Sequence, residues 1–250
     1  MFAPRFRLGP PHDASLDGHR VDALFGLTAE LVGGCFVIII VVLAYLLVRY
    51  RARPGVRAKY LDGASRWHLY GVLAVAAFVF VGIDFNLIRI AHADLTQHLW
   101  HFPRGHDALR IEVMSQRWLW NMRYAGADGQ FATADDVTTV NDLRVPVNTP
   151  VVLQLAARDV IHSLFLPNFR IKQDAIPGRI TRMWFQATET GTFDIACAQL
   201  CGFAHYQMRG TLTVMPRAPY ERWLSRTAAD SRRTYDPANA AAHWGWAWPE

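Results

Sequence analysis

Cysteine is scarce in this sequence, and the pattern that attaches a haem covalently is missing. The 250 residues contain three cysteines, at positions 35, 197 and 201, and no Cys-x-x-Cys-His run. A c-type haem is attached through such a run, so we expect no covalently bound haem on this chain. The first twenty residues contain no apolar core followed by a cleavage site, so we expect no conventional cleaved signal peptide either.

Charge is nearly absent from two long stretches in the first third of the chain. Residues 24–48 carry one charged residue, Glu30, and residues 67–88 carry one, Asp84. A bilayer core of about 30 Å needs roughly 20 helical residues, so both stretches are long enough to span it. We expect a transmembrane helical hairpin over 24–90, with two buried helices of a soluble protein as the alternative.

Basic residues crowd the connector between the two spans. They are Arg49, Arg51, Arg53, Arg57, Lys59 and Arg66. The positive-inside rule places this connector in the cytoplasm, so residues 1–23, the chain beyond about Arg89 and both termini lie on the outer face. We expect an integral protein of a bacterial inner membrane, whose hairpin packs against a larger membrane partner. The formal charge of +5 reflects this topology, so we expect no nucleic-acid binding, and Cys35 faces the membrane.

Beyond residue 109 the apolar pattern changes to short runs rich in β-branched and aromatic residues, separated by turn residues. The runs cover 109–113, 143–147, 151–155, 180–185, 193–196 and 210–214. Several short strands at this spacing predict a sandwich or a Greek-key barrel. We assign this all-β domain to residues 91–217 and a C-terminal tail to 218–250, in which 220–226 forms a short helix.

Four soft metal ligands fall within twelve residues of the β-domain. They are Cys197, Cys201, His205 and Met208, in the pattern C-x3-C-x3-H-x2-M. His162, in an apolar and strand-like segment upstream, is the best further donor. Thiolate and thioether together select copper, and a His/Cys set with a weak Met is typical of a cupredoxin electron-transfer site. Zinc held by two Cys and two His, and a plain disulfide between the cysteines, are the alternatives.

The chain resembles subunit II of the haem-copper oxidases, a cupredoxin-like subunit that carries the dinuclear copper centre called CuA. The resemblance rests on the C-x-x-x-C-G-x-x-H-x-x-M run, on D-V-I-H-S at 159–163 and on K-Q-D-A-I-P-G-R at 172–179, and it extends over about 24–214. It implies that Cys197 and Cys201 bridge two copper ions. It also implies that His162 and His205 bind one copper each, and that Met208 and the backbone carbonyl of Gln199 are weak ligands.

The resemblance also implies where electrons enter. Trp118 matches the position through which the family accepts electrons from cytochrome c, and Asp159 matches an acidic residue that docks the donor. Arg117 and Leu119 stand where the family usually has Gln and an aromatic residue. On sequence alone, aromatic clusters such as this one are more often core than conduit. Because the chain has no haem of its own, its electron donor is expected to be a separate protein.

The implied function is electron transfer within a terminal oxidase. Electrons from cytochrome c or a similar protein donor reach the dinuclear copper, and then the haem of the catalytic haem-copper subunit I, where oxygen is reduced to water. Further oxidase subunits are expected partners, and the chain itself is not the site of oxygen chemistry. The same role in a copper-containing nitric oxide reductase is one alternative. A non-redox interaction module stapled by zinc or a disulfide is another.

Two departures from the family pattern concern other ligands and protons. Many relatives have Glu where Gln199 stands, and that side chain also holds magnesium at the interface with the catalytic subunit. A neutral amide is a poorer ligand for a hard cation, which argues against magnesium here. No Glu lies between Glu30 and Glu112, although many relatives place one near the cytoplasmic start of the second span, at the mouth of a proton path. Asp62 is the nearest acidic substitute.

A polar loop over 126–136 contains three aspartates and no basic residue. Such a loop would suit calcium or a basic partner. Hydrogen bonding of Asp side chains to nearby backbone groups is the more common reason for this composition, so we expect a solvated turn.

Overall fold

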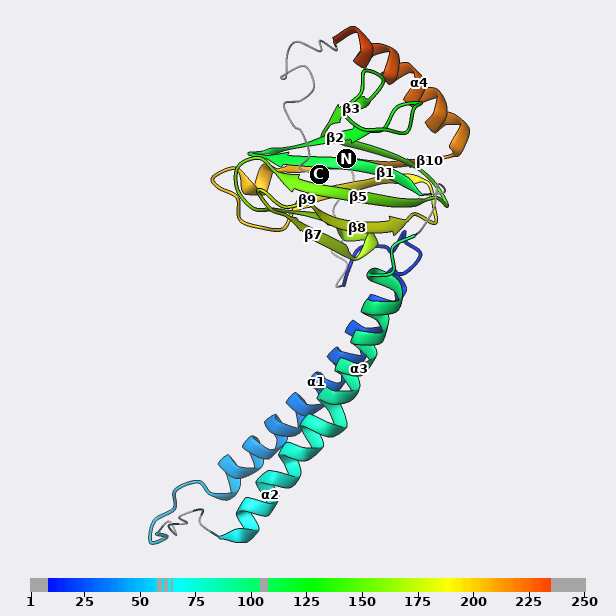
Figure 1. Cartoon of the computed structure of the whole chain (residues 1–250). Coiled ribbons are helices and arrows are strands. Elements are labelled where there is room, and N and C mark those ends of the chain that lie inside the picture. Colours follow the sequence, from blue (N-terminus) through cyan, green and yellow to red (C-terminus); the bar gives the residue numbers. More distant parts are fainter. Residues whose placement is uncertain (1–8, 58–59, 61–62, 64, 104–107, 235–250) are drawn as a thin grey trace, which may run out of the picture. The chain divides into compact units, whose positions relative to one another are not determined.

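The computed structural model describes residues 9–57, 60, 63, 65–103 and 108–234, and it divides the chain into two units. One unit is helical and covers Arg20–Gln97, and the other contains the β-strands (Figure 1). Lys59, Asp62 and the tail beyond residue 234 lie outside the described residues, so the expectations about them stay predictions.

Two long helices account for the apolar stretches. The first, α1, runs over Gly18–Arg49. The second is one continuous helix made of α2 (Arg66–Ala77), the π-helical η1 (Phe78–Asp84), α3 (Phe85–Asp94) and η2 (Leu95–Leu99). Both are long and apolar enough to cross a membrane. Every large apolar side chain from Val32 to Val48 is at least 41% exposed, so lipid or a partner has to cover this surface.

Ten strands of the described chain form two five-stranded sheets that pack face to face (Figure 1). They are β1 (Leu109–Gln116), β2 (Leu119–Tyr124), β3 (Val137–Val140), β4 (Asp142–Pro146), β5 (Pro150–Ala157), β6 (His162–Leu166), β7 (Ile171–Ala175), β8 (Thr181–Gln186), β9 (Gly191–Cys197) and β10 (Arg209–Met215). The sheet orders are β3-β2-β1-β5-β8 and β4-β10-β9-β6-β7. The β1–β5 and β4–β10 pairs are parallel and the other pairs are antiparallel.

The core of the sandwich is built by alternate residues of both sheets. Ile111, Val113 and Leu153 point inward from the first sheet and Leu164 and Ile195 from the second, and all five are fully buried. Side chains of a strand alternate between the two faces of its sheet, so this pattern buries one face of each. The expected fold class, a two-helix hairpin followed by an all-β cupredoxin-like domain, is confirmed.

Each of the six predicted apolar runs falls on a strand, whereas β2, β3 and β7 were not predicted as strands. β3 and β7 each form one edge of a sheet and read Val-Thr-Thr-Val and Ile-Lys-Gln-Asp-Ala. Polar residues occupy the middle of both strands, so neither has a continuous apolar run to detect, whereas the opposite edge strands β8 and β4 have one. β2 carries the aromatic segment around Trp120, which sequence alone marks as core.

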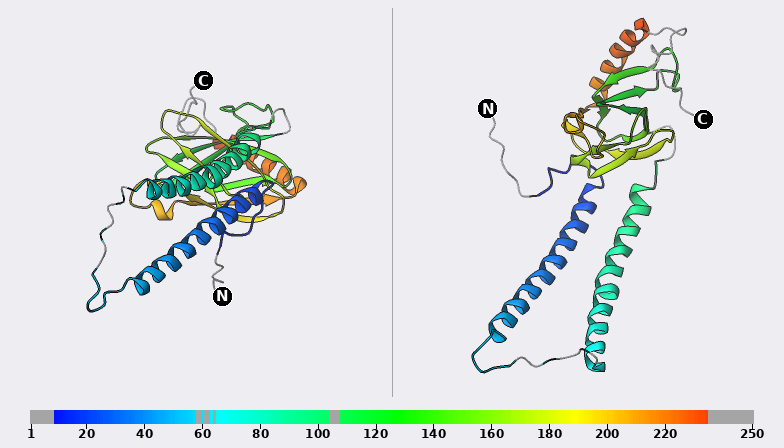
Figure 2. Two further views of the ribbon diagram at one scale, coloured as in Figure 1. Left: turned by 90° about the horizontal axis from the view of Figure 1, so that it is seen from below. Right: turned by 90° about the vertical axis from the view of Figure 1, so that its left-hand side faces the viewer.

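The helix expected over 220–226 is longer than predicted. α4 covers Arg217–Thr234 and lies against β3 and β4 (Figure 2). The Trp223 ring packs edge-on against Tyr124 with 5.4 Å between ring centroids, and the Arg144 guanidinium lies 5.2 Å above it. These contacts come from strands far away in sequence, and they stabilise a helix whose own composition is polar.

The segment just before α1 is part of the β unit. Ala14 is fully buried, its N–H donates to the carbonyl of Asn168 at 2.9 Å, and its carbonyl accepts from the N–H of Thr188 at 2.9 Å. Ser15 forms an isolated antiparallel bridge with Ala187 beyond the end of β8. The β unit therefore includes residues from both sides of the helical hairpin.

Candidate metal centre

Two connections at one end of the sandwich position the predicted ligands. His162 is the first residue of β6, and Cys197 is the last residue of the neighbouring strand β9. The connection from β9 to β10, gold in Figure 1, carries the other ligands. Its ends are closed by hydrogen bonds from the Cys197 N–H to the Met208 carbonyl and from the Ala198 N–H to the Ser163 carbonyl. Strand pairing thus brings together residues that are 35 positions or more apart in sequence.

The two sulfur atoms of the cysteines are separated by the distance expected of two thiolates on one metal. Cys197 Sγ and Cys201 Sγ lie 3.8 Å apart. Two thiolates bound to a metal at about 2.3 Å in tetrahedral geometry are roughly 3.8 Å apart. A disulfide requires about 2.05 Å, so the cysteines are not bonded to each other.

The remaining predicted ligands surround these two sulfur atoms. Cys201 Sγ lies 3.6 Å from His205 Nδ1 and 3.8 Å from Met208 Sδ, and His162 Nδ1 lies 3.2 Å from Met208 Sδ. The carbonyl oxygen of Gln199 is 3.3 Å from Cys197 Sγ. The ligand atoms of His162, Cys197 and Cys201 all lie within 4.8 Å of one another. The structure therefore gathers all six predicted ligands, and this soft donor set fits copper.

The cluster is shielded from solvent unevenly. His162 is fully buried, Met208 is 1% exposed and Cys201 is 4% exposed, whereas Cys197 and His205 are half-buried. A buried, apolar surrounding limits the access of water and of other metal ligands to the site.

The protonation of the two cysteines differs in the metal-free chain. Burial acts to raise the pKa of Cys197, but hydrogen bonds with His162 and with the backbone of Ser163 and Gln199 outweigh it and lower this pKa to about 6. Burial and the neighbouring Cys197 charge raise the pKa of Cys201 to about 11. The metal-free site therefore holds one thiolate beside one thiol at neutral pH.

Asp159 is bonded to the ligand His162 rather than projecting into solvent. Its Oδ1 lies 2.8 Å from His162 Nε2, and its Oδ2 accepts from the Arg117 N–H at 2.9 Å and from Arg117 Nε at 3.0 Å. Burial acts to raise the pKa of Asp159, but these hydrogen bonds outweigh it and hold the pKa well below its usual range. A carboxylate on Nε2 leaves Nδ1 free to bind a metal, which is the usual arrangement for a ligating histidine.

Sequence reasoning missed this link between Arg117, Asp159 and His162. The D-x-x-H spacing at 159–162 was visible, but the contact from Arg117 depends on β1 and β5 running parallel side by side. The role in donor docking expected for Asp159 stays a prediction.

Trp118 lies at the surface beside the cysteine loop and is 38% exposed. A Cβ atom added at Gly202 would lie 3.5 Å from two atoms of the Trp118 indole, so the ring packs over this glycine. Gly202 also has φ 124°, a conformation that other residues rarely adopt. The next tryptophan, Trp120, is fully buried and packs edge-on against His162.

Comparisons with known proteins identify the family. Residues 109–214 match the family described as cytochrome c oxidase subunit II, periplasmic domain. The chain is 31% identical over 234 residues to the alternative cytochrome c oxidase subunit 2 of Bradyrhizobium diazoefficiens, covering 82% of this chain and 79% of the relative. This chain belongs to the cytochrome c oxidase subunit 2 family. The family assignment confirms the predicted resemblance, and it makes the chain a subunit of an oxidoreductase complex, with an outer domain on a membrane anchor.

A further relative and a solved structure are also similar to this chain. Cytochrome c oxidase subunit 2 of Cereibacter sphaeroides is 26% identical over 231 residues, covering 83% of this chain and 76% of the relative. Among solved structures, the periplasmic domain of cytochrome oxidase subunit II from Bradyrhizobium japonicum is similar to 51% of this chain over 97% of its own length, at 28% identity and a TM-score of 0.45.

Proposed function

We propose that this chain is the subunit through which electrons enter a haem-copper terminal oxidase, and that it holds a dinuclear copper centre of the CuA type. The observation that carries the proposal is the pair of cysteine sulfur atoms 3.8 Å apart, with an imidazole and a thioether close to Cys201 Sγ. In this proposal Cys197 and Cys201 bridge, His162 and His205 are the terminal ligands, and Met208 and the Gln199 carbonyl are weak ligands.

The chain's own residues support a relay rather than catalysis. Bound copper would supply the redox chemistry, and the thiolates of Cys197 and Cys201 would hold both ions, which would keep the change in geometry between redox states small. Asp159 orients the His162 ring, and Trp120 packs against that ring from the core. These supports hold the ligands in place whichever redox state is present, and rigid ligands favour fast electron transfer.

Oxygen is the terminal acceptor that we propose, since the relatives compared above are named as cytochrome c oxidase subunits. Reduction of oxygen would take place in the catalytic haem-copper subunit I, with further oxidase subunits in the complex. A nitric oxide reductase built on the same copper site is the alternative, and oxygen against nitric oxide consumption by the purified complex separates the two.

We propose that cytochrome c or a similar protein is the donor and that Trp118 is where electrons enter. The ring is partly exposed and packs over Gly202, next to the ligand Cys201. We also propose that the β unit and both termini lie on the outer face. Ala14, which precedes the first span, is hydrogen-bonded to Asn168 and Thr188 of the β unit. This contact supports placing the N-terminal segment on the same side of the membrane as the β unit.

Copper analysis of the whole chain tests the proposal. The N-terminal segment belongs to the β unit, so a fragment that starts near Leu99 would lack part of its core, and the complete chain in detergent is the proper sample. We expect two coppers per chain and an electron paramagnetic resonance spectrum with equal coupling to two copper nuclei. Cys197→Ser and Cys201→Ser are expected to abolish both, because a hydroxyl does not bridge soft metals. One zinc per chain with no copper uptake would refute the dinuclear centre.

A further inference from the structure

Several connections of the sandwich lie at the same end as the metal ligands. β1 and β5 run parallel, so the β1–β2 and β5–β6 connections are neighbours. A bridge between Ala157 and Pro177 places the β7–β8 turn beside them. The segments 117–118, 158–161, 176–180 and 198–208 therefore form one surface, which we call the metal-end surface.

The metal-end surface is apolar at its centre. Among the described residues of the β unit, eight large apolar side chains are exposed, and five of them lie here: Trp118 at 38%, Ile161 at 43%, Leu200 at 76%, Phe203 at 90% and Tyr206 at 67%. Trp118 packs over Gly202, and Phe203 is the next residue along the chain. A group of exposed aromatic and aliphatic side chains of this kind marks a site of protein contact.

The charged residues of the metal-end surface are mainly cationic. Arg117, Arg158 and Arg179 are exposed, and Asp159 is the one acidic residue in the four segments. The Asp159 side chain is 22% exposed, and both of its oxygens are bonded, one to His162 and the other to Arg117. Its negative charge is therefore compensated within the chain.

The strands that border these segments do not reverse this sign. Asp194 on β9 and Arg209 on β10 line the same hollow as Cys197 and His205, and both are exposed. Lys172 and Asp174 on β7 are also exposed, so these strands carry two charges of each sign. Asp142, at the start of β4, is paired with Arg144 at 2.9 Å. Within the four segments the one acidic group, Asp159, is offset by Arg117, so the exposed Arg158 and Arg179 give the described residues of this surface a net positive charge.

We propose that the metal-end surface selects a protein electron donor whose docking face carries acidic residues around an apolar redox edge, rather than a donor with a basic face. The proposal rests on the electron-transfer function proposed above and specifies the partner of that site. Complementary charge speeds the encounter of two proteins, and like charge slows it. The apolar centre provides the close contact, and the arginines provide the steering.

Stopped-flow reduction of the purified, complete oxidase complex tests this. The two probes are a mitochondrial-type cytochrome c of high isoelectric point and an acidic bacterial c-type cytochrome, each prereduced. Ionic strength is raised from about 10 mM to about 150 mM, which shortens the Debye length from about 30 Å to about 8 Å. We expect the bimolecular rate constant of the acidic cytochrome to fall at least about fivefold with salt, and that of the basic one to rise or stay constant.

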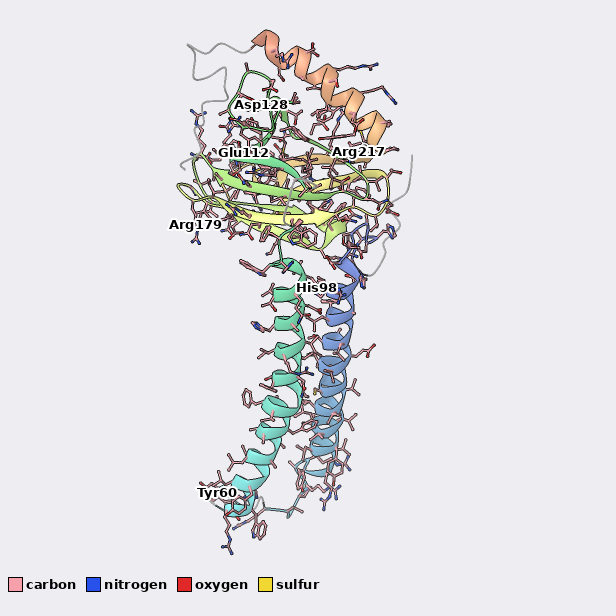
Figure 3. All side chains as sticks on the ribbon, turned by 45° about the vertical axis from the view of Figure 1, so that its right-hand side comes forward. Tyr60, His98, Glu112, Asp128, Arg179 and Arg217 are labelled. Carbon is pink, nitrogen blue, oxygen red and sulfur yellow. The ribbon has the colours of Figure 1, made fainter. Side chains whose placement is uncertain are left out.

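Arg158→Glu is the informative variant, because Arg117 is bonded to Asp159 beside a ligand. At low salt it should lower the rate constant with the acidic cytochrome about three- to tenfold, and raise it with the basic one. Arg222→Glu makes the same charge change on α4 and is the control. Its neighbour Trp223 packs on Tyr124, at the end of β2 that is far from the metal ligands. This variant should leave both rate constants unchanged. Figure 3 shows Arg179 and Arg217, the first residue of α4, on opposite sides of the β unit.

Four outcomes overturn the proposal. A rate constant with the basic cytochrome that falls as salt is raised refutes the charge selection. Equal effects of Arg158→Glu and Arg222→Glu on the rate constants refute it too. Both results leave the proposed electron-transfer function standing. Loss of the catalytic subunit from the Arg158→Glu preparation shows that this surface faces that subunit instead of the donor. Failure of both cytochromes to reduce a complex whose copper is reduced by dithionite refutes the proposed function itself.

Discussion

Arg123→Met is expected to destabilise the β unit strongly, because Arg123 is the cation between two buried carboxylates. The side chains of Arg123, Glu112 and Asp136 are 2%, 4% and 7% exposed. Arg123 Nε donates to Glu112 Oε2 at 2.7 Å and lies 3.7 Å from Asp136 Oδ2. Burial raises the pKa of Asp136, although hydrogen bonding to Ala132 and the Arg123 charge act against this rise. Methionine is apolar and of similar length, so the substitution removes the charge and leaves little empty space.

The expected loss is several kcal/mol and depends on pH. Removing one partner of a buried ion pair costs about 3–5 kcal/mol in the free energy of unfolding. With a urea dependence of about 2 kcal/mol per molar, the unfolding midpoint should fall by about 2 M. The pKa of Asp136 is already raised by burial, and the variant removes the Arg123 charge that lowers it, so the folded chain binds more protons at this carboxyl than the unfolded chain. Stability is then lost as pH rises through the folded pKa of Asp136, by about 1.4 kcal/mol for every tenfold difference in proton affinity between the folded and unfolded states.

Urea unfolding of the whole chain in detergent, followed by tryptophan fluorescence at about pH 7 and about pH 5, measures both effects. The deficit of the variant should be larger at neutral pH. Arg217→Met is the matched control, since its 3.0 Å ion pair with Glu221 has side chains that are 75% and 60% exposed. Exposed pairs of this kind contribute about 0–1 kcal/mol. A cost of Arg123→Met no larger than that of the control, or equal at both pH values, would refute the reasoning.

The remaining predictions concern the metal-end residues. Trp118→Phe should keep copper content and donor affinity while the electron-transfer rate falls sharply in rapid-mixing kinetics; an unchanged rate with a lowered melting temperature would make Trp118 a core residue only. Asp159→Asn should lower copper affinity about 10- to 100-fold in chelator competition, because it removes the anion that orients His162; unchanged copper affinity with weaker donor binding would support a docking role instead. In the metal-free chain, iodoacetamide should modify Cys197 before Cys201 at neutral pH, with a rate that rises through about pH 6, since the two pKa values are about 6 and about 11; equal modification of both, measured by peptide mass spectrometry, would contradict this order.

Local patterns in the sequence are sufficient for the anchor, for the class of the outer domain and for the proposed ligands. A span of about 20 apolar residues is recognisable by itself, because a membrane helix satisfies its own backbone hydrogen bonds and needs only an apolar surface. The four ligands from Cys197 to Met208 lie within twelve residues, so their spacing is visible without knowledge of the fold. The predicted strands are those with continuous apolar runs, whereas β3 and β7 have polar residues in their middle and were missed.

Contacts between segments far apart in sequence were decided by the tertiary structure alone. The parallel pairing of β1 with β5 brings Arg117 to Asp159, and this carboxylate also contacts the predicted ligand His162. The burial of Ala14 against the β unit joins the two sides of the helical hairpin into one unit. Such pairings depend on strand order and register, which result from the total burial of many side chains at once. No short motif records them, so the proposed ligands can be read from the sequence, but the groups that orient and surround them cannot.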